Sequence, residues 1–453
     1  MDNAATLARQ LHEAEAALNG LQYEGLELGV TLSFFFDRTF YGYFDQRPFA
    51  HFCELCLYLA KTIGKANYLK DHKVSLIYYK SGNHRHSNML EKVVRQAVTD
   101  KDKALIIGPT GASDVDTSRV FYHAGLRELI KISVFLYRHY SFITDTLKPL
   151  LLSDRQKRAF WFFLIRQLEK GVSLKQFISR QSSLKLIGAD YDRGADSSLF
   201  FAVAEALKLF GFNFQHGVIN PPVGYAPLNA DEIWVWGEMA RLQLLSSGVA
   251  NQRIRIVGTP IVESLILSEK VRSEVLQSLH LKSGKTIVLA LSQPDKINDL
   301  KLVSLFQAIS QQYGTQQDNF LVKIHPSYPS SDYAWVETAF NLTVLPKEIP
   351  YLDFLNIVDI LLAHTSGIAT EVLHYGKRVG ILDILDQSPG NGKELNTYFN
   401  VPLLKSADDF QVLLKQPVNE VPSNIAFYKT GQEAEKEMVR HIQYRLNNLA
   451  GKS

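Results

Sequence analysis

One stretch of the chain combines the residue types that bind phosphate. In LLAHTSGIATEVLHYGKRVGILD, Leu361 to Asp383, an apolar run leads into a small polar turn and then a helical pattern. The turn consists of His364, Thr365, Ser366 and Gly367. Backbone N–H groups at a helix start, together with hydroxyls, donate to phosphate oxygens, and the helix dipole favours negative charge there. Glu371, just over a turn further along, could accept from the ribose hydroxyls of the same nucleotide. Simple capping of the helix by the two hydroxyls is the alternative.

Two other segments are expected to bring polar groups to the same place. His325 and Pro326 end the apolar run NFLVKIHP, and Ser292 and Gln293 end the run TIVLALSQ. An imidazole can donate to a phosphate oxygen, and a proline after it fixes the direction of the loop. A lone histidine is more often structural, but the later His-Thr-Ser-Gly turn favours a phosphate site shared by these segments.

Candidates for a general base lie in the first half of the chain. His216 follows the apolar run FNFQ, so its ring would face the space between two sheets and could remove a proton or hold a leaving phosphate. Asp190 and Asp192 follow another predicted strand and offer an alternative base, although a solvated loop would also explain them. The sequence does not choose between the histidine and the two aspartates.

Two series of short apolar runs would position these residues. The first series comprises Val74–Tyr79, Ala104–Gly108, Ser183–Ala189, Phe212–Gly217, Glu232–Gly237 and Arg253–Gly258. The second comprises Thr286–Ser292, Asn319–Pro326, Leu342–Pro346, Asp359–Gly367 and Arg378–Asp383. Helix-length segments separate the runs; one of them, Ser197–Phe210, is expected to end at Gly211. Strands that alternate with helices indicate parallel sheets.

We therefore predict an α/β fold with two Rossmann-like domains whose parallel sheets face each other across a cleft. The first domain is expected over residues 1–270, with a helical insertion around 128–180. The second, which would hold the nucleotide, is expected over 271–425, and a last helix over 426–453. With 453 residues, the chain exceeds the usual size of a single core, which agrees with two domains.

Composition excludes several classes of protein. A net charge of +3 is too small to argue for nucleic acid as a partner, so an anion must be held by a local site. Cys53 and Cys56 are the two cysteines, which excludes a disulfide scaffold and a four-cysteine zinc site. The first residues carry acids and lack an apolar core, so no signal peptide is expected, and no apolar run is long enough to span a bilayer. We expect a cytoplasmic protein.

An aromatic run, Phe160 to Ile165 with basic residues on both sides, has two interpretations. It could lie on an anionic membrane surface and give peripheral contact with the inner membrane. The preferred interpretation is a buried helix with basic ends.

The motifs together resemble a known group of enzymes. Gln215–Gly217 with Tyr225, Ala230–Glu238, Arg253–Pro260, KIHP and HTSG followed by Glu371 and Gly376-Lys377 resemble bacterial GT-B glycosyltransferases that build capsule and lipopolysaccharide. The resemblance covers residues 184–383. It is closest to sialyl- and Kdo-transferases, which use CMP-sugars, and to CDP-glycerol glycerophosphotransferases.

The resemblance implies roles for individual residues. His325 and Pro326 would bind the phosphate of CMP, Thr365 and Ser366 would donate to the same phosphate, and Glu371 would hold the ribose. His216 and Gly217 are similar to the His-Gly of the glycerophosphotransferases, in which the histidine is implicated in catalysis. The pair of acids followed by glycine that sialyltransferases carry is only partly matched, by Asp192-Arg193-Gly194.

The function expected from this resemblance is glycosyl transfer from a nucleotide-sugar, CMP-Kdo or CMP-sialic acid before others, to a glycan or glycolipid acceptor. No metal or other cofactor is expected. A UDP-sugar donor stays open, as do a UDP-GlcNAc 2-epimerase and a non-catalytic nucleotide-sugar-binding subunit. A metal-dependent enzyme with an Asp-x-Asp site is a further rival, with Asp190-Tyr191-Asp192 or Asp114-Val115-Asp116 as the site.

Overall fold

The structure is a computed structural model. It describes residues 2–40, 72–82, 85–98, 103–108, 113–121, 126–217, 219, 224–262, 268–291, 296–325, 329–364, 367–385, 391–416 and 426–449. Cys53 and Cys56 lie outside these residues. Among the helices described, none is both long and apolar enough to cross a membrane.

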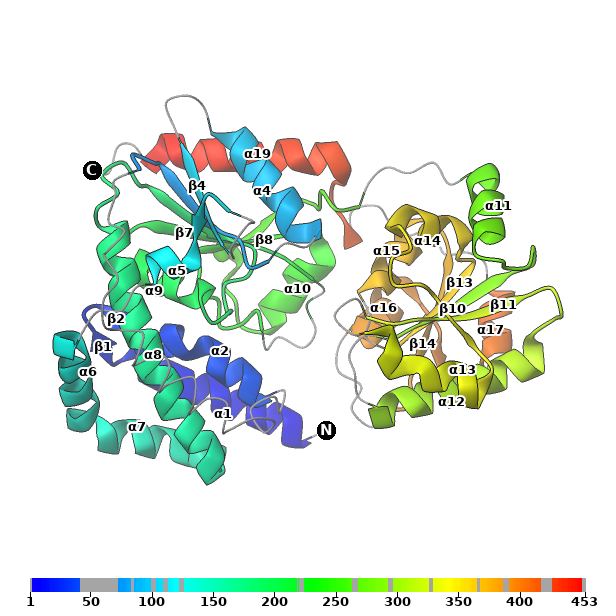
Figure 1. Cartoon of the computed structure of the whole chain (residues 1–453), viewed down its shortest axis with the longest axis horizontal. Helices are drawn as coiled ribbons and strands as arrows, with labels where there is room; N and C mark the ends of the chain where they lie inside the picture. The colour runs from blue at the N-terminus through cyan, green and yellow to red at the C-terminus, as the bar shows by residue number, and fades with distance from the viewer. Residues whose placement is uncertain are drawn as a thin grey trace.

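The first lobe is built on a seven-stranded sheet in the order β5-β4-β3-β6-β7-β8-β9, and all its pairings are parallel (Figure 1). Its strands are β3 (Leu76–Tyr79), β4 (Ala104–Gly108), β5 (Val115–Asp116), β6 (Leu186–Ala189), β7 (Phe210–Phe214), β8 (Glu232–Val235) and β9 (Ile254–Ile256). The central strands are buried along their length, because helices cover both faces of the sheet.

Helices and one short hairpin complete this lobe. The hairpin is β1 (Gln22–Tyr23) with β2 (Leu26–Glu27). The helices are α1 (Asp2–Asn19), α2 (Leu28–Phe40), α4 (Arg85–Ala97), α5 (Thr117–Val120), α6 (Leu126–Arg138), α7 (Tyr140–Leu147), the 3-10 turn η2 (Lys148–Leu150), α8 (Asp154–Ile178), α9 (Ser197–Ala206), α10 (Glu238–Ser246) and the 3-10 turn η3 (Asn251–Arg253). Helices α6 to α8 form the helical region that interrupts the strands.

The predicted end of one helix is wrong. Gly211 was expected to terminate the helix that begins at Ser197, but α9 ends at Ala206 and Gly211 lies inside strand β7. The residue that turns the chain is Lys208, which has a left-handed φ of 55°. A side chain at the position of Gly211 would meet the ring of Phe201, so the glycine serves the packing of α9 on the sheet.

The second lobe has a six-stranded parallel sheet in the order β12-β11-β10-β13-β14-β15. Its strands are β10 (Thr286–Ala290), β11 (Asn319–Lys323), β12 (Thr343–Val344), β13 (Ile360–Ala363), β14 (Arg378–Leu382) and β15 (Leu403–Leu404). Its helices are α11 (Glu269–Ser278), α12 (Lys296–Tyr313), the 3-10 turn η4 (Ser330–Tyr333), α13 (Ala334–Phe340), α14 (Tyr351–Ile357), α15 (Ile368–His374), α16 (Asn391–Phe399) and α17 (Phe410–Lys415). The predicted α/β fold with two Rossmann-like parallel sheets is confirmed.

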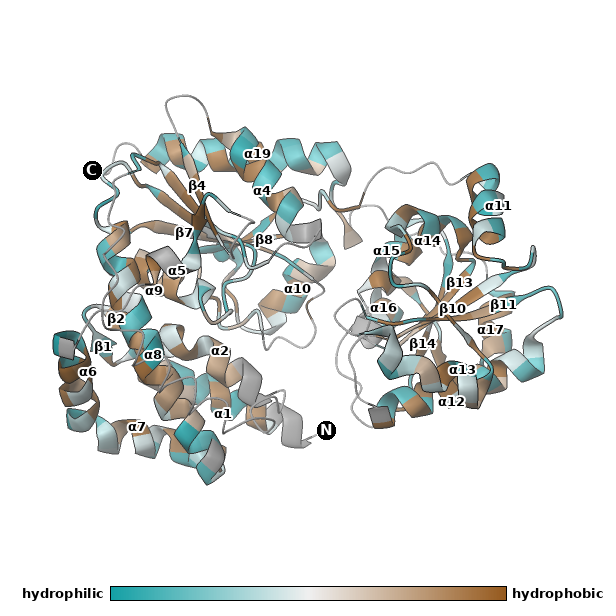
Figure 2. Ribbon diagram, viewed as in Figure 1, coloured by the Kyte–Doolittle hydropathy of each residue, from teal (hydrophilic) through white to brown (hydrophobic). Residues whose placement is uncertain are grey.

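The last helix returns to the first lobe. Helix α19 (Gly431–Asn448) buries Met438, Ile442 and Leu446 in one apolar cluster with β3, α4 and Trp234 of β8. It lies beside α4 in Figure 1. Figure 2 shows apolar strands beneath these two helices, and a polar outer surface on α19. The first sheet is therefore covered on this face by a helix that follows the whole second lobe in sequence.

The segments that leave and re-enter the first lobe are bonded to each other. Thr259 forms a parallel bridge with Thr430, its N–H donates to the carbonyl of Lys429 at 2.9 Å, and the N–H of Gly431 donates to the carbonyl of Thr259 at 3.1 Å. Gly258 precedes this bridge with a φ of 91°, and a Cβ atom there would clash with the backbone of Lys429. This position therefore requires glycine.

Replacing Gly258 by alanine should destabilise the protein more than the same change at Gly248. Gly248 has a similar φ of 85°, but no described atom lies within 4 Å of its would-be Cβ. G248A should cost about 1–3 kcal/mol from backbone strain alone, and G258A should cost more because it also separates the two crossing segments. Chemical denaturation of both variants measures the difference, and equal losses would contradict the steric role of Lys429.

Candidate functional site

Strands β11 and β13 end at the same level on either side of β10. In the sheet, Ala290 pairs with Lys323 of β11 and also with Ala363 of β13. Because neighbouring strands lie about 4.8 Å apart, these two strand ends are about 10 Å from each other. His325 follows Lys323 by two residues and His364 follows Ala363 directly, so both histidines lie at the carboxyl edge of the second sheet.

Several residues of the predicted phosphate site lie outside the described residues. They are Ser292, Gln293, Pro326, Thr365 and Ser366. Gly367 is described, and it is the residue before the first turn of α15. The predicted meeting of His325 with the two hydroxyls therefore stays a prediction.

His364 joins two strands. It is buried, and its Nδ1 lies 2.9 Å from the carbonyl oxygen of Leu382 at the end of β14. Since a carbonyl oxygen can only accept, Nδ1 carries the proton and donates it. Through Nδ1, His364 ties β13 to β14, and the predicted contact of its other ring nitrogen with phosphate stays a prediction.

A group of charged and polar side chains surrounds His325. Burial lowers the pKa of Lys323, while the carboxylate of Glu371 opposes that shift. Burial lowers the pKa of His325 as well, and the positive charges of Lys323 and Lys347 lower it further. The hydroxyl of Tyr351 donates to Glu371. Both groups are thus held below their ordinary pKa, and a bound anion would favour the protonated form of each.

Sequence reasoning missed Lys323, Lys347 and Tyr351. A signal for Lys323 was present, because it is the charged last residue of an otherwise apolar strand, NFLVK. Such a residue emerges at the carboxyl edge of a parallel sheet, where ligands of α/β proteins bind. No comparable signal marks Lys347 or Tyr351, since they reach the site through loop and helix geometry.

In the first lobe, Tyr225 orients His216. The Tyr225 hydroxyl oxygen accepts from the N–H of Gly217 and donates to the Gly217 carbonyl, both at 3.0 Å, and it lies 3.2 Å from Nδ1 of His216. A phenol has one proton, so all three contacts coexist only if Nδ1 of His216 is the donor. The basic lone pair is then on Nε2. The ring of Tyr191 packs against the same imidazole at 4.4 Å between centroids.

Asp190 is a buried structural carboxylate. It accepts from the backbone N–H of Ser81 at 3.1 Å, from the Ser81 hydroxyl at 2.9 Å and from the Ser87 hydroxyl. These bonds join the loop after β6 to the segment after β3. We therefore withdraw Asp190 as a candidate base.

Asp192 has the pKa of a base but the surroundings of a structural group. Burial raises its pKa to about 6. Its side chain is fully buried: Oδ1 accepts from the Asn213 amide at 2.9 Å, and Oδ2 accepts from the N–H groups of Asn229 at 2.8 Å and Ala230 at 3.4 Å. The two oxygens thus join the loop after β6 to strand β7 and to the loop before β8, and we withdraw Asp192 as well.

Neither Asp-x-Asp sequence has the form of a metal site. Asp114 accepts from Arg95 at 2.8 Å and from the N–H of Ile106 at 2.9 Å. Asp190 and Asp192 are occupied as described above. Across the described part of the chain, no group of three histidine, cysteine or acidic side chains is arranged to hold a metal ion.

Aromatic side chains connect the first sheet to the second lobe near these edges. Trp236 follows β8, and its indole N–H donates to the carbonyl of Gln215 at 3.1 Å. Its ring lies 5.9 Å from that of Phe427, which in turn lies 5.1 Å from the ring of His374 at the end of α15. The end of β8 and the helix of the predicted phosphate site therefore belong to one packed cluster.

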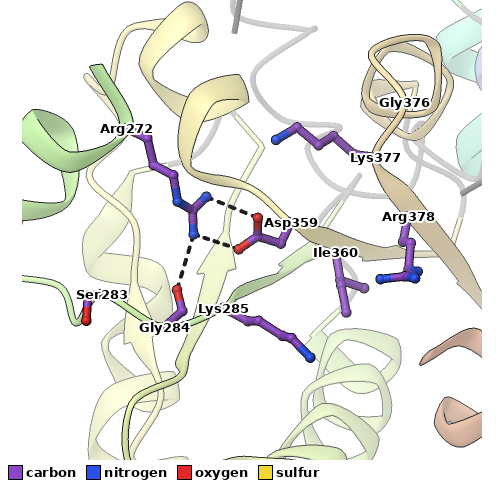
Figure 3. Close-up of a pocket in the computed structure, with 9 residues that line it drawn as sticks. All are labelled: Arg272, Ser283, Gly284, Lys285, Asp359, Ile360, Gly376, Lys377 and Arg378. Carbon is purple, nitrogen blue, oxygen red and sulfur yellow. Dashed lines mark hydrogen bonds and ion pairs between the residues drawn. The ribbon is translucent and has the colours of Figure 1, made fainter. Parts of the chain in front are cut away.

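A cavity of about 510 Å³ lies at the opposite edge of the second sheet (Figure 3). It is lined by Arg378 and by Asp359, which precedes β13, so it is at the amino ends of the strands. Arg272 donates to both oxygens of Asp359, at 2.7 and 3.1 Å, and to the carbonyl of Ile357 at the end of α14. Figure 3 shows Lys285, Lys377 and Arg378 pointing in different directions. We interpret this pocket as a structural junction.

No protein-family model and no curated protein sequence matches the chain. Among solved structures it is similar to UDP-GlcNAc 2-epimerase from Methanocaldococcus jannaschii, with 14% identity, a TM-score of 0.49 and coverage of 82% of this chain and 99% of that one.

Two further structures are similar over most of the chain. UDP-GlcNAc 2-epimerase from Neisseria meningitidis has 10% identity and a TM-score of 0.47, with coverage of 84% and 99%. The wall teichoic acid polymerase TagF has 9% identity and a TM-score of 0.45, with coverage of 89% and 96%. Likenesses at this level assign neither a reaction nor a ligand, so function must be argued from the residues of this chain.

The pKa of His325 tests the geometry of the site directly. Its imidazole should titrate below 6.5, and K347M should raise its pKa because a neighbouring positive charge is removed. NMR titration of the histidine side chains measures both values. K282M, which removes an exposed lysine at the other edge of the sheet, is the control. An unchanged His325 pKa in K347M would place Lys347 away from the imidazole.

Proposed function

We propose that this protein is a glycosyltransferase that moves a sugar from a nucleotide-activated donor to a glycan or glycolipid in bacterial surface polysaccharide synthesis. The observation that carries the proposal is the pairing of two unlike polar edges. The edge at β11 and α15 carries Lys323 and His325, which suit an anion. The edge after β7 carries His216, whose imidazole is oriented by Tyr225 with its lone pair on Nε2. Transfer of a sugar needs both an anion site and a proton acceptor.

The donor would bind to the second lobe. Lys323 and His325 would stabilise the charge that develops on the departing phosphate, and backbone N–H groups at the start of α15 would add to this effect. Glu371, held by Tyr351, would accept from the ribose hydroxyls. We propose CMP as the nucleotide, on the strength of the His325-Pro326 motif.

The acceptor would bind to the first lobe, where His216 would remove the proton from its hydroxyl. Asp190 and Asp192 are engaged in buried hydrogen bonds that hold the fold, so we propose His216 as the base. Tyr225 would keep the imidazole in the tautomer that accepts at Nε2. Because cationic and N–H groups supply the charge stabilisation, we propose that turnover needs no divalent ion, and added chelator tests this.

The nucleotide and the reaction can be tested separately. A nucleotide at about 100 times its dissociation constant stabilises the folded protein by about 2.7 kcal/mol, so thermal melting with CMP, CDP, UDP and GDP identifies the nucleotide that binds.

Product analysis after incubation with UDP-GlcNAc alone then tests the rival epimerase activity, because epimerisation needs no acceptor. An isomer formed without acceptor would replace the transferase proposal by an epimerase. Binding without turnover of any donor would indicate a non-catalytic subunit.

His325→Ala should weaken nucleotide binding by about 10- to 150-fold, the equivalent of roughly 1.5–3 kcal/mol for a hydrogen bond to a charged group. A bound phosphate raises the pKa of His325, so wild-type affinity should increase as the pH falls towards 6.5, and H325A should lose this dependence. Titration calorimetry measures both effects. H139A, in the first lobe, should bind as the wild type does; wild-type affinity in H325A would remove His325 from the site.

His216→Ala should lower kcat by about 10²- to 10⁴-fold, the usual contribution of a general base. Nucleotide affinity should not change, because His216 lies in the other lobe. Y225F should have a smaller effect on kcat, since it removes the group that orients the imidazole. A pH–rate profile of H216A that keeps the wild-type acidic limb would show that another group is the base.

A further inference from the structure

Exposed apolar side chains gather on α6, α7 and the turn after them. Among the described residues twelve large apolar side chains are exposed, and six of these lie between residues 130 and 151. The six are Ile130, Val134, Tyr137, Tyr140, Phe142 and Leu151, which we call the apolar face of α6–α7. Tyr137 and Leu151 are 85% and 89% exposed. Single exposed apolar residues are ordinary, but a cluster of them marks a binding surface.

Helix α6 has two exposed stripes that lie side by side. At 3.6 residues per turn, Ile130, Val134 and Tyr137 fall within about 60° of one another, and three basic residues occupy the adjoining 60° or so. The basic residues are Arg127, Lys131 and Arg138. The opposite side of the helix packs into the lobe through Ile132 and Leu136. An apolar stripe beside a basic stripe on a surface helix is typical of helices that lie in a membrane interface.

Basic residues outnumber acidic residues around this face. Residues 126–166 contain eight of the 49 lysines and arginines but only three of the 46 acidic residues, so the remainder of the chain has a small acidic excess. One of those three acids, Glu128, is buried and accepts from the hydroxyl of Tyr23. The other carboxylate oxygen of Glu128 pairs with Lys131 at 3.1 Å. Seven other lysines and arginines remain against two acids, so the region has a net positive charge. Positive charge beside an apolar face complements a surface of anionic headgroups.

The aromatic run singled out in the sequence is not itself this face. Phe160 and Leu164 are fully buried, and the ring of Phe160 packs on that of Phe35 at 5.0 Å. Trp161, however, stacks on Tyr140 with ring centroids 5.3 Å apart. The buried side of α8 thus supports the region, and its tryptophan extends the apolar face of α6–α7.

We propose that the apolar face of α6–α7 docks on an anionic phospholipid surface. Tyrosine and tryptophan suit the headgroup region because their rings are apolar and their tips polar. Helices α6 and α7 lie on the side of the first lobe away from the second lobe (Figure 1). This inference concerns a surface distinct from both candidate edges and does not depend on the reaction proposed above.

Vesicle co-sedimentation of the full chain tests the inference. The protein should bind vesicles rich in phosphatidylglycerol and not vesicles of phosphatidylcholine alone, and binding should weaken in high salt. I130S/V134S/Y137S should lower partitioning at least about tenfold. R127Q/R138Q/K148Q should lower it about 100-fold. Nucleotide-induced melting shifts of both variants should match those of the wild type, which separates this test from that of the transferase.

Matched controls carry the same changes elsewhere. V412S/Y444S removes exposed apolar side chains, and K282Q/K301Q/K415Q removes exposed charges; both should bind vesicles as the wild type does. Binding by all variants alike, or equal binding to uncharged vesicles, would overturn the proposal. So would a wild-type dimer in light scattering that I130S/V134S/Y137S converts to a monomer, because the face would then be an interface between two copies.

Discussion

The backbone bonds between the outgoing and returning segments fix how the two lobes meet. Thr259 is held between the carbonyl of Lys429 and the N–H of Gly431, and the backbone N–H of Tyr428 donates to the carbonyl of Trp236 at 2.8 Å. These bonds are short-range and directional, so they set the path of the chain where it passes from one sheet to the other. The aromatic contacts of Phe427 then place the end of β8 in one cluster with α15. Any ligand shared by the two sheets depends on this junction.

The charged groups at the two candidate edges are in different states. In the second lobe, burial lowers the pKa of both Lys323 and His325, and the positive charges of Lys323 and Lys347 lower the pKa of His325 further. A bound anion would offset both shifts. In the first lobe, the carboxylates of Asp190 and Asp192 hold separate segments together by hydrogen bonds, and the buried Arg193 pairs with Glu15 of α1 at 2.8 Å. Rigid loops of this kind hold an imidazole in one orientation, as a general base requires.

The sequence predicted the longer strands well, because buried parallel strands are continuous apolar runs, but it did not predict the two-residue edge strands β5 and β15. The prediction that Gly211 ends a helix was wrong, because in sequence a glycine that ends a helix cannot be told from a glycine inside the following strand. The importance of Lys323 was visible as a charge at a strand end, whereas Tyr351 and Lys347 approach the site only through folding. Asp190 and Asp192 have the residue types and spacing of a catalytic pair, and only their buried hydrogen bonds in the folded chain show a structural role. Hydrogen bonds between distant segments leave no mark in local sequence.

Helix α19 has a consequence for biosynthesis. On the ribosome the first lobe emerges before the second, but one face of its sheet, which includes Tyr78 and Trp234, is fully covered only when Met438, Ile442 and Leu446 of α19 join the side chains of α4 there. That face stays unsealed for the time needed to translate the intervening lobe, at rates of about 5–20 residues per second. The nascent chain therefore exposes this apolar face for longer than it would if the first lobe were complete in sequence before the second. A chaperone that shields the face would reduce aggregation and improve the yield of native protein.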